Sequence, residues 1–535
     1  MTDQNRYDRQ LRLWGEVAQN RLEHSHLLTI GSDCVSTEFL KSIILPGIGH
    51  VTIADNKIID EFDIETNFFV EISDVEKQRG EITLKNLLEL NDRVTGEFKC
   101  IDLQTILKTE NETHFLKQFN IIVCTNQKHS EVLQLTEMTE YPVIEVCING
   151  YLGYVKAYYK SFVIFDNGSE KVMDLRIQEP FPKLIELYNS IDWKNISKED
   201  HSHLPFPLIL LRAMNEWKNE MKEKNESNEM IGEKYEMNLT NVIPKKIGDK
   251  NRIKQIIKTE QKSYIEENFT EALKYAFHCW APAKGEITQL MNDQRKDQFA
   301  QMNINEDKEF WMFINVVRKF YDKNGRIPVD PTLNDMICGN EFFVKLQTAY
   351  RNQMDEDVKE MMEEVVKLNE LCGSEILNEE SVRRYCKSIR RMRVHDGITP
   401  NRVNVDSHGN EIKEIYNDYD FEGDESLMMY LMIFYGVFEF VEQYGRMPCD
   451  TKDVEELKKQ TEKIMKMKGL ENIQVNQQQV EEICRFGGVQ IHAVNSVIGS
   501  FVGQEVVKFT THQFECLHST FLFNLHSGQS LHGLY

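Results

Sequence analysis

The stretch HLLTIGSDCVSTEFLKSIILPGIGHVTIAD, residues 26–55, predicts the fold of this chain. Its first five residues form an apolar run that meets a glycine, as a buried strand does at a tight turn. A helix is expected next, because apolar residues recur at helical spacing over 39–44 and Pro46-Gly47 stops the pattern. A second strand, Val51–Ala54, ends at Asp55. Strand, helix and strand in this order are typical of a βαβ unit.

Further strands are predicted on both sides of a long helical region. The runs 121–124 and 143–146 have the length and composition of buried strands. A helix with small residues over 489–508 and a strand over 521–525 then follow the helical region. Because strands alternate with helices, we predict an α/β fold with a parallel sheet. The predicted domains are a first sheet segment, a mainly helical insertion and a returning sheet segment: 1–160, 161–484 and 485–535.

Two helices of the predicted insertion, 310–321 and 427–441, end in nearly the same spelling. Gly325-Arg-Ile-Pro-Val-Asp330 follows the first, and Gly445-Arg-Met-Pro-Cys-Asp450 follows the second. Glycine and proline at these positions are typical helix stops. One short echo does not establish a repeat architecture, so we interpret it as two helices ended by the same chemistry.

Charge and cysteine content exclude several classes of function. The formal net charge is −23, whereas nucleic-acid binding needs clustered Lys and Arg, so no nucleic-acid partner is expected. No apolar run reaches the ~18 residues of a membrane span, and the N-terminus is polar, so we expect an intracellular protein without a membrane partner. The 11 cysteines include no C-x-x-C pair, which predicts a reducing compartment and no metal site.

The turn after the first strand is a degenerate phosphate-binding loop. Such a turn needs several glycines so that backbone N–H groups approach the phosphate. Here it reads Gly31-Ser-Asp-Cys-Val-Ser36, with only the first glycine, and Asp33 and Cys34 bring side chains into the turn. Asp55 stands where nucleotide folds often place an acid for ribose hydroxyls. We expect no nucleotide at this loop, and Asp55 as a leftover acid or a helix cap.

The N-terminal sequence YDRQLRLWG, residues 7–15, combines Arg9 and Arg12 with apolar Leu11 and Trp14. Taken alone, it predicts an amphipathic helix held by the tryptophan. The same sequence resembles the opening of the adenylation-type subunits of ubiquitin-like modifier activating enzymes, a family of ThiF/MoeB type. The blocks 45–55 and 491–505 also resemble this family.

The chain departs from the catalytic members of the family that it resembles. Their glycine loop is broken here, and the arginine expected near Asn67 is absent. Thr125-Asn126-Gln127 replaces the acid that would bind magnesium. No cysteine has the Pro-x-Cys-Thr context of the thioester cysteine, and Cys124 is interpreted as a buried core residue.

The resemblance therefore implies an inactive, Rossmann-like adenylation domain interrupted by a helical region that lacks the catalytic cysteine. It implies a regulatory subunit that binds no cofactor of its own and that pairs with a catalytic subunit holding ATP and magnesium. Arg9 would act in trans, toward ATP in the partner's site, as an arginine finger does. Further implied partners are the ubiquitin-like modifier and, transiently, a conjugating enzyme, in the cytoplasm and also the nucleus.

Within this family, chain length favours the subunit that supports neddylation, since the SUMO counterpart is shorter. The equivalent subunit for SUMO or another modifier remains an alternative, as does an autonomous homodimeric adenylating enzyme. A nucleotide-dependent oxidoreductase and a pure adaptor are further alternatives. The oxidoreductase needs the full G-x-G-x-x-G turn, which is missing.

Overall fold

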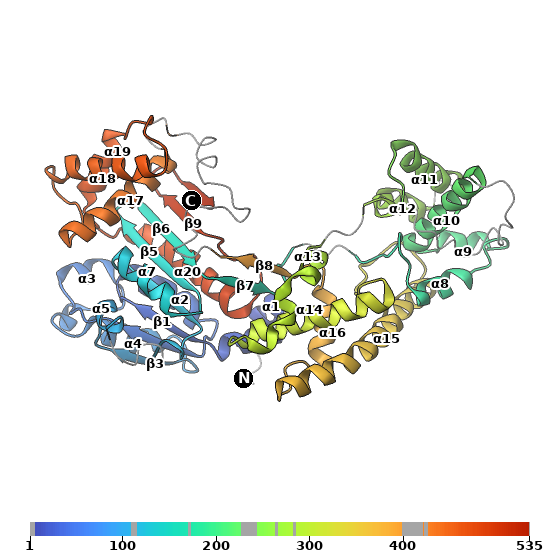
Figure 1. Cartoon of the computed structure of the whole chain (residues 1–535), viewed down its shortest axis with the longest axis horizontal. Coiled ribbons are helices and arrows are strands. Elements are labelled where there is room, and N and C mark those ends of the chain that lie inside the picture. The colour runs from blue at the N-terminus through green and yellow to red at the C-terminus, as the bar shows by residue number, and fades with distance from the viewer. Residues whose placement is uncertain are drawn as a thin grey trace. The chain divides into compact units, whose positions relative to one another are not determined.

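The computed structural model of the chain consists of two units (Figure 1). The first unit combines Met1–Ile164 with Val394–Tyr535, and the second is Phe165–Arg393. No helix among the described residues is both long and apolar enough to cross a membrane. The structure describes these residues: 6–108, 115–169, 173–225, 243–262, 266–281, 285–397, 421 and 426–533.

An eight-stranded mixed sheet forms the centre of the first unit, in the order β10-β9-β6-β5-β4-β1-β2-β3. The strands from β3 to β5 are parallel, and β6, β9 and β10 continue the sheet with antiparallel pairing. The α/β prediction is therefore confirmed. The strands of the sheet are β1 (His26–Ile30), β2 (His50–Ala54), β3 (Thr95–Lys99), β4 (Ile121–Thr125), β5 (Val143–Asn149), β6 (Leu152–Tyr158), β9 (Thr520–Asn524) and β10 (Gln529–Gly533). A separate two-stranded sheet consists of β7 (Ser161–Ile164) and β8 (Arg393–Asp396).

The register of the central strands determines where a site can form. Ile30 of β1 pairs with Ala54 of β2 on one side and with Cys124 of β4 on the other. The three strands therefore end level with one another. In parallel sheets, ligands bind beyond these carboxyl ends.

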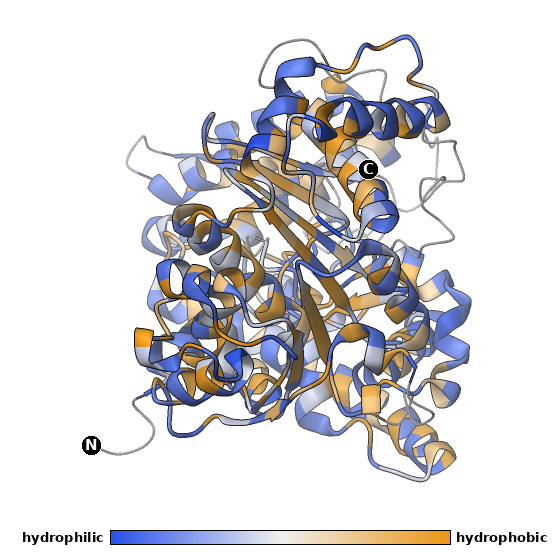
Figure 2. Ribbon diagram, turned by 90° about the vertical axis from the view of Figure 1, so that its left-hand side faces the viewer, coloured by the Kyte–Doolittle hydropathy of each residue, from blue (hydrophilic) through white to orange (hydrophobic). Residues whose placement is uncertain are grey.

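One face of the sheet is covered by α2 and α20, which pack on each other, while α1 packs on α20 and α4 packs on α2. In Figure 2 the central strands are hydrophobic along most of their length, as expected for strands buried on both faces of a sheet. Gly499 of α20 lies against α2, where an added Cβ would come within 2.5 Å of the Glu38 Cβ. The small residues that the sequence showed in this helix thus permit close helix packing. The helices are α1 (Asp8–Glu23), α2 (Cys34–Ile44), α4 (Arg79–Leu88) and α20 (His492–Thr511).

The other face is covered in part by helices that come late in the chain. Cys147, Tyr154 and Leu522 of the sheet share an apolar core with α17, α18 and α19. Leu28, Ile122 and other strand residues share a second core with α5 and α7. These helices are α5 (Leu103–Ile106), α7 (His129–Met138), α17 (Leu427–Tyr444), α18 (Asp453–Met467) and α19 (Gln477–Phe486), and α3 (Glu61–Thr66) and η2 (Ile72–Asp74) complete the unit.

The first division between the units, after Ile164, lies four residues beyond the predicted end at 160, but the second differs from the predicted border at residue 484. The sheet-containing unit resumes at Val394, about ninety residues before the predicted return. The reason is that α17, α18 and α19 bury their apolar sides against the sheet. Helical periodicity predicts that one face of a helix is buried, but it does not predict which surface that face packs against.

The second unit is mainly helical. One of its cores is formed by α8, α10, α11 and α12 together with Tyr350 of α15. Its helices are α8 (Pro182–Asn189), α9 (Lys198–Ser202), α10 (Phe206–Asn225), α11 (Ile247–Glu260), α12 (Glu267–Lys274), η3 (Ala276–Cys279), α13 (Ile287–Asn292), η4 (Gln294–Asp297), η5 (Phe299–Gln301), α14 (Asn305–Asn324), α15 (Asn340–Cys372) and α16 (Glu379–Ser388).

The two helix stops with the same spelling have the same geometry. Both terminal glycines are left-handed, with φ of 68° and 67°. Arg326 donates to both oxygens of Asp357 at 2.7 and 2.6 Å. Arg446 donates in the same way to Asp453 at 2.7 and 2.9 Å. The echo thus reflects one way of ending a helix, used once in each unit.

Candidate functional site

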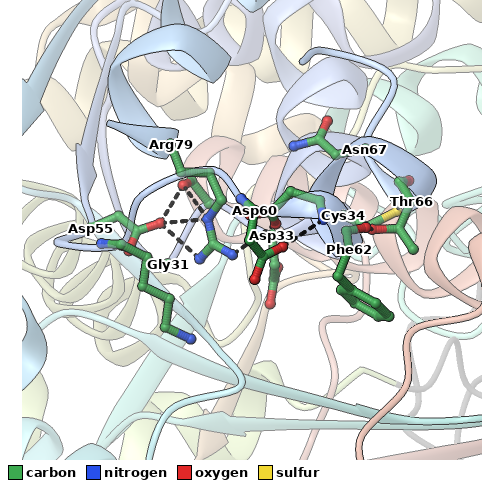
Figure 3. A network of polar contacts seen from close by, with 12 residues as sticks. Gly31, Asp33, Cys34, Asp55, Asp60, Phe62, Thr66, Asn67 and Arg79 are labelled. Carbon is green, nitrogen blue, oxygen red and sulfur yellow. Dashed lines mark hydrogen bonds and ion pairs between the residues drawn. The ribbon is translucent and has the colours of Figure 1, made fainter. Parts of the chain in front are cut away.

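The candidate site lies at the carboxyl ends of β1, β2 and β4, around the turn that begins with Gly31 (Figure 3). Gly31 has a φ of 103°, which favours glycine. An added Cβ would lie 2.5 Å from the Thr125 Oγ1 and 3.0 Å from the Thr125 carbonyl oxygen. The remaining glycine of the loop is therefore required by the fold, whether or not the loop binds anything.

Asp33 occupies the anion position at the start of α2. Its carboxylate caps the helix, accepting from the Ser36 N–H at 3.2 Å and the Ser36 Oγ at 3.0 Å. Its other oxygen accepts from the Asn126 amide at 2.6 Å and the Gln490 amide at 3.1 Å. Burial raises the pKa of Asp33, but the charge of Arg79 and these hydrogen bonds outweigh burial and lower it. An ionised carboxylate thus stands where a phosphate would bind a helix N-terminus.

Asp55 is held in a buried ion-pair network. Arg79 donates to the Asp55 Oδ2 at 2.8 and 3.0 Å and to the Asp63 Oδ1 at 3.0 Å. Ser32 also donates to the Oδ2, and the Lys57 N–H donates to the Oδ1 at 3.0 Å. Both oxygens are therefore engaged. Asp55 is thus an ion-pair partner rather than a helix cap, and its interpretation as a leftover acid stays a prediction.

Arg79 was not among the residues that sequence reasoning singled out. It is the first residue of α4 and is 7% exposed. Burial lowers its pKa, but the carboxylates of Asp55, Asp33 and Asp63 outweigh burial and raise it. The acids at the ends of the predicted strands could have indicated that a buried cation such as Arg79 is needed, because clustered buried carboxylates need a cation.

Asn67, where catalytic relatives were expected to carry an arginine, takes no part in this network. It ends α3 and is 2% exposed, and its Oδ1 accepts from the Phe69 N–H at 2.9 Å. Arg79 thus supplies a guanidinium to the site from a different element.

A cavity of about 440 Å³ remains beside this network, within the first unit. Its walls combine apolar side chains with Lys57, Lys128 and Arg446. Asp33, Asp63 and Arg79 also line the cavity, so charged side chains of the chain itself stand where phosphates would bind. The remaining apolar lining residues include Ile58, Phe62, Ile148, Val437, Phe438, Val441 and Met447.

The cysteines near the site lack the environment of a nucleophile. Cys34 donates to the Thr66 carbonyl at 2.9 Å, and burial raises the pKa of its thiol to about 12, with Asp33 adding to the effect. Cys124 is fully buried in β4, and burial also raises the pKa of its thiol. Since the thiolate is the reactive form, neither thiol is activated.

The N-terminal motif presents Arg9 to solvent. Tyr7, just before α1, is 5% exposed, and its hydroxyl accepts from the Asn91 amide at 3.0 Å. Gly15 breaks α1 with φ of 83° and ψ of 168°. Arg12 pairs with Asp8 at 3.0 Å, whereas Arg9 is exposed and makes no hydrogen bond or ion pair with a described residue. The helix expected over the motif is therefore present up to Gly15, and a second helical segment follows that break.

A buried lysine lies near the cavity. Lys156 of β6 is 3% exposed and stands opposite Glu145 of β5. Glu145 accepts from the Tyr158 hydroxyl at 2.8 Å and contacts His129 at 2.9 Å. Burial lowers the pKa of Lys156 from 10.5 to about 8, although the charge of Glu145 opposes the shift.

We expect Lys156→Met to raise stability at pH 7 and to change its pH dependence. Between about pH 8 and 10.5 the unfolded chain keeps a proton that the folded chain has released, so wild-type stability rises with pH, by roughly 3 kcal/mol in total. The variant should lack this rise. Urea unfolding across this range would measure it, with Lys160→Met as an exposed control; a wild-type slope unchanged in Lys156→Met would contradict the assignment.

The sheet order, the turn at Gly31 and the polar network at the strand ends define an α/β protein of adenylation type whose phosphate position is filled by its own side chains. Residues 7–531 match the model of the ThiF family, and the chain belongs to that family.

Three similar proteins each cover nearly the whole chain. The NEDD8-activating enzyme E1 regulatory subunit of Gallus gallus is 29% identical, over 97% of this chain and 96% of the relative. The NEDD8-activating enzyme E1 regulatory subunit AXL of Arabidopsis thaliana is 27% identical over 98% of each. The Nedd8-activating enzyme E1 regulatory subunit of Drosophila melanogaster is 26% identical, over 98% of this chain and 96% of the relative. Among solved structures, that of E. coli MccB is similar over 29% of this chain and 45% of the MccB chain. The sequence identity is 18% and the TM-score is 0.26.

Proposed function

We propose that this chain is the regulatory, non-catalytic subunit of a heterodimeric NEDD8-activating enzyme. The similarity that supports this runs over nearly the full length of relatives from a vertebrate, an insect and a plant, all named for NEDD8. The corresponding subunit for SUMO or another modifier is less favoured for the same reason. In this role the chain supports protein neddylation, including that of cullins, in the cytoplasm and the nucleus.

The observation that carries the non-catalytic role is the position of Asp33. ATP would place its phosphates at the N-terminus of α2, but a buried, ionised carboxylate already accepts the donors there. Both oxygens of Asp55 already accept hydrogen bonds, which leaves the carboxylate less capacity for ribose hydroxyls. Asn126 stands where a magnesium ligand would be needed, and its amide donates to Asp33. These residues do not fit ATP and magnesium, so we derive no ATP chemistry on this chain.

The contribution of this chain to catalysis is assigned to Arg9. The catalytic subunit would hold ATP and magnesium, adenylate the modifier and form the thioester on its own cysteine. Arg9 is exposed, is not committed to any described partner, and lies on a segment held by Tyr7. A guanidinium reaching into the partner's site would offset charge developing on the departing pyrophosphate. The modifier and, transiently, the conjugating enzyme are the further partners.

The test uses the purified chain with and without a catalytic subunit, together with ATP, magnesium and NEDD8. Thioester is followed on a non-reducing gel, and isotope exchange between pyrophosphate and ATP reports adenylate formation. We expect both signals only with the two subunits together, and the thioester only on the partner. An adenylate or thioester formed by this chain alone would overturn the proposal and favour an autonomous adenylating enzyme. Activity with SUMO and none with NEDD8 would assign a different modifier.

A further inference from the structure

Helix α11 has a charge opposite to that of the chain as a whole. The segment 245–262 contains seven Lys and Arg residues but only two acids, in a chain of net charge −23. Both the acid near its end and its arginine have partners elsewhere: Glu260 pairs with Arg212 at 3.1 Å, and Arg252 pairs with Glu220. The lysines therefore carry the excess positive charge.

The fold places three of these lysines on one outward stripe. Ile253, Ile256 and Ile257 of α11 are buried in the core of the second unit. The stripe consists of Ile247, Lys250, Lys254 and Lys258, which are three or four residues apart and so share one helix face. No carboxylate of a described residue forms an ion pair with the three lysines of the stripe.

Two of the lysines converge on a single indole ring. The Lys250 and Lys254 ammonium groups lie 5.7 and 5.6 Å from the centroid of Trp280. The ring attracts each cation, but like charges four residues apart on a helix repel one another. A local arrangement that is unfavourable without a partner is the kind of feature that functional surfaces show. An anionic partner would remove the repulsion.

Large apolar side chains accompany the charge. Ile247, at the start of the stripe, is 76% exposed. Phe277 of η3, an element that packs on α11, is 43% exposed. Exposed aromatic and aliphatic groups beside unpaired lysines are typical of a protein-binding surface rather than of a purely solvated helix face.

We propose that this surface, defined by Ile247, Lys250, Lys254, Lys258, Phe277 and Trp280, binds an acidic segment of another protein that carries a large apolar residue. Carboxylates of the segment contact the lysines, and its apolar residue covers Phe277 or Ile247. The net charge of −23 disfavours a long nucleic acid, whose many phosphates would be repelled by the rest of the chain. A short acidic segment meets only the local positive field.

The test uses the full chain and a short fluorescein-labelled peptide of glutamate and aspartate with one central leucine. Lys250→Glu/Lys254→Glu reverses the charge at the ring. Lys459→Glu/Lys463→Glu on α18 is the matched control, because these lysines are also exposed and four residues apart, but pair with Glu456 and Glu439. We expect the peptide to bind wild type and control equally, and the α11 variant about tenfold more weakly.

Binding should also weaken with salt and should decrease when the central leucine is replaced by serine. Trp280→Leu, with folding checked by thermal unfolding, should reduce binding as well. The proposal is overturned if the peptide does not bind, if both charge-reversal variants bind alike, or if the serine peptide binds as well as the leucine peptide. Equal competition by a single-stranded oligonucleotide of matched charge would indicate a nucleic-acid surface instead, which also overturns it.

Discussion

Replacing Arg9 by alanine is expected to slow thioester formation by the heterodimer by about 100-fold, which is the typical effect of removing one group that stabilises developing charge. The expectation rests on the proposed function and on two observations. Arg9 is exposed and has no hydrogen bond or ion pair to a described residue, and Tyr7 holds the segment through its contact with Asn91. Single-turnover formation of the thioester, at saturating NEDD8 and ATP, measures the effect.

Arg12→Ala is the matched control for this prediction, because Arg12 lies on the same helical segment and is already paired with Asp8. We expect it to retain most of the activity. Arg9→Lys should recover part of the rate, since lysine keeps the charge but not the planar fork of donors. If Arg9→Ala and wild type form thioester at the same rate, with the heterodimer intact, the residue is not a catalytic contributor and the chain acts only as a scaffold.

Replacing Arg79 by alanine is expected to destabilise the first unit by about 3–5 kcal/mol, the typical effect of leaving a buried charge without its partner. The guanidinium neutralises Asp55 and Asp63, whose side chains are 4% and 7% exposed. Without it, two carboxylates would remain buried beside Asp33 with no described cation in contact. Urea unfolding followed by circular dichroism measures the loss.

Two further variants separate charge from packing. Arg6→Ala removes an exposed arginine that pairs with Asp92, and it should change stability little. The triple variant Arg79→Met/Asp55→Asn/Asp63→Asn removes the three charges of the two ion pairs and should recover much of the loss, because Asp55 and Asp63 then need no counter-ion. Asp33 keeps its hydrogen bonds from Ser36, Asn126 and Gln490 in this variant. A triple variant as unstable as Arg79→Ala alone would show that the guanidinium matters through shape rather than through charge.

The order of elements around the site was predictable because it depends on local patterns. The run 26–55 predicted strand, turn, helix and strand, and the structure has β1, α2 and β2 there. The loss of the phosphate loop was also predictable, since Asp33 and Cys34 stand where glycines are needed. The ion pair of Asp55 with Arg79 was not, because the two residues are 24 positions apart and no periodicity relates them.

The assignment of α17, α18 and α19 shows the same limit at the level of domains. Apolar periodicity over 427–441 correctly predicted the helix α17, and the predicted helical insertion runs to residue 484. Which surface buries these helices depends on β6 and β9, strands that are separated by more than 350 residues in the sequence. The turn Gly325-Arg and the turn Gly445-Arg were read from sequence as equivalent, yet they lie in different units.

The amino-acid sequence by itself determined the sheet-forming elements, the degenerate loop at Gly31 and the N-terminal motif that carries Arg9. Each of these depends on residues that are close together in the sequence. Only the tertiary structure decided what fills the degenerate loop. Asp33 receives hydrogen bonds from Asn126 and from Gln490, which is 457 positions away, and Arg79 reaches Asp55 from another helix. Such contacts form because a buried charge must find its partner wherever the folded chain brings one.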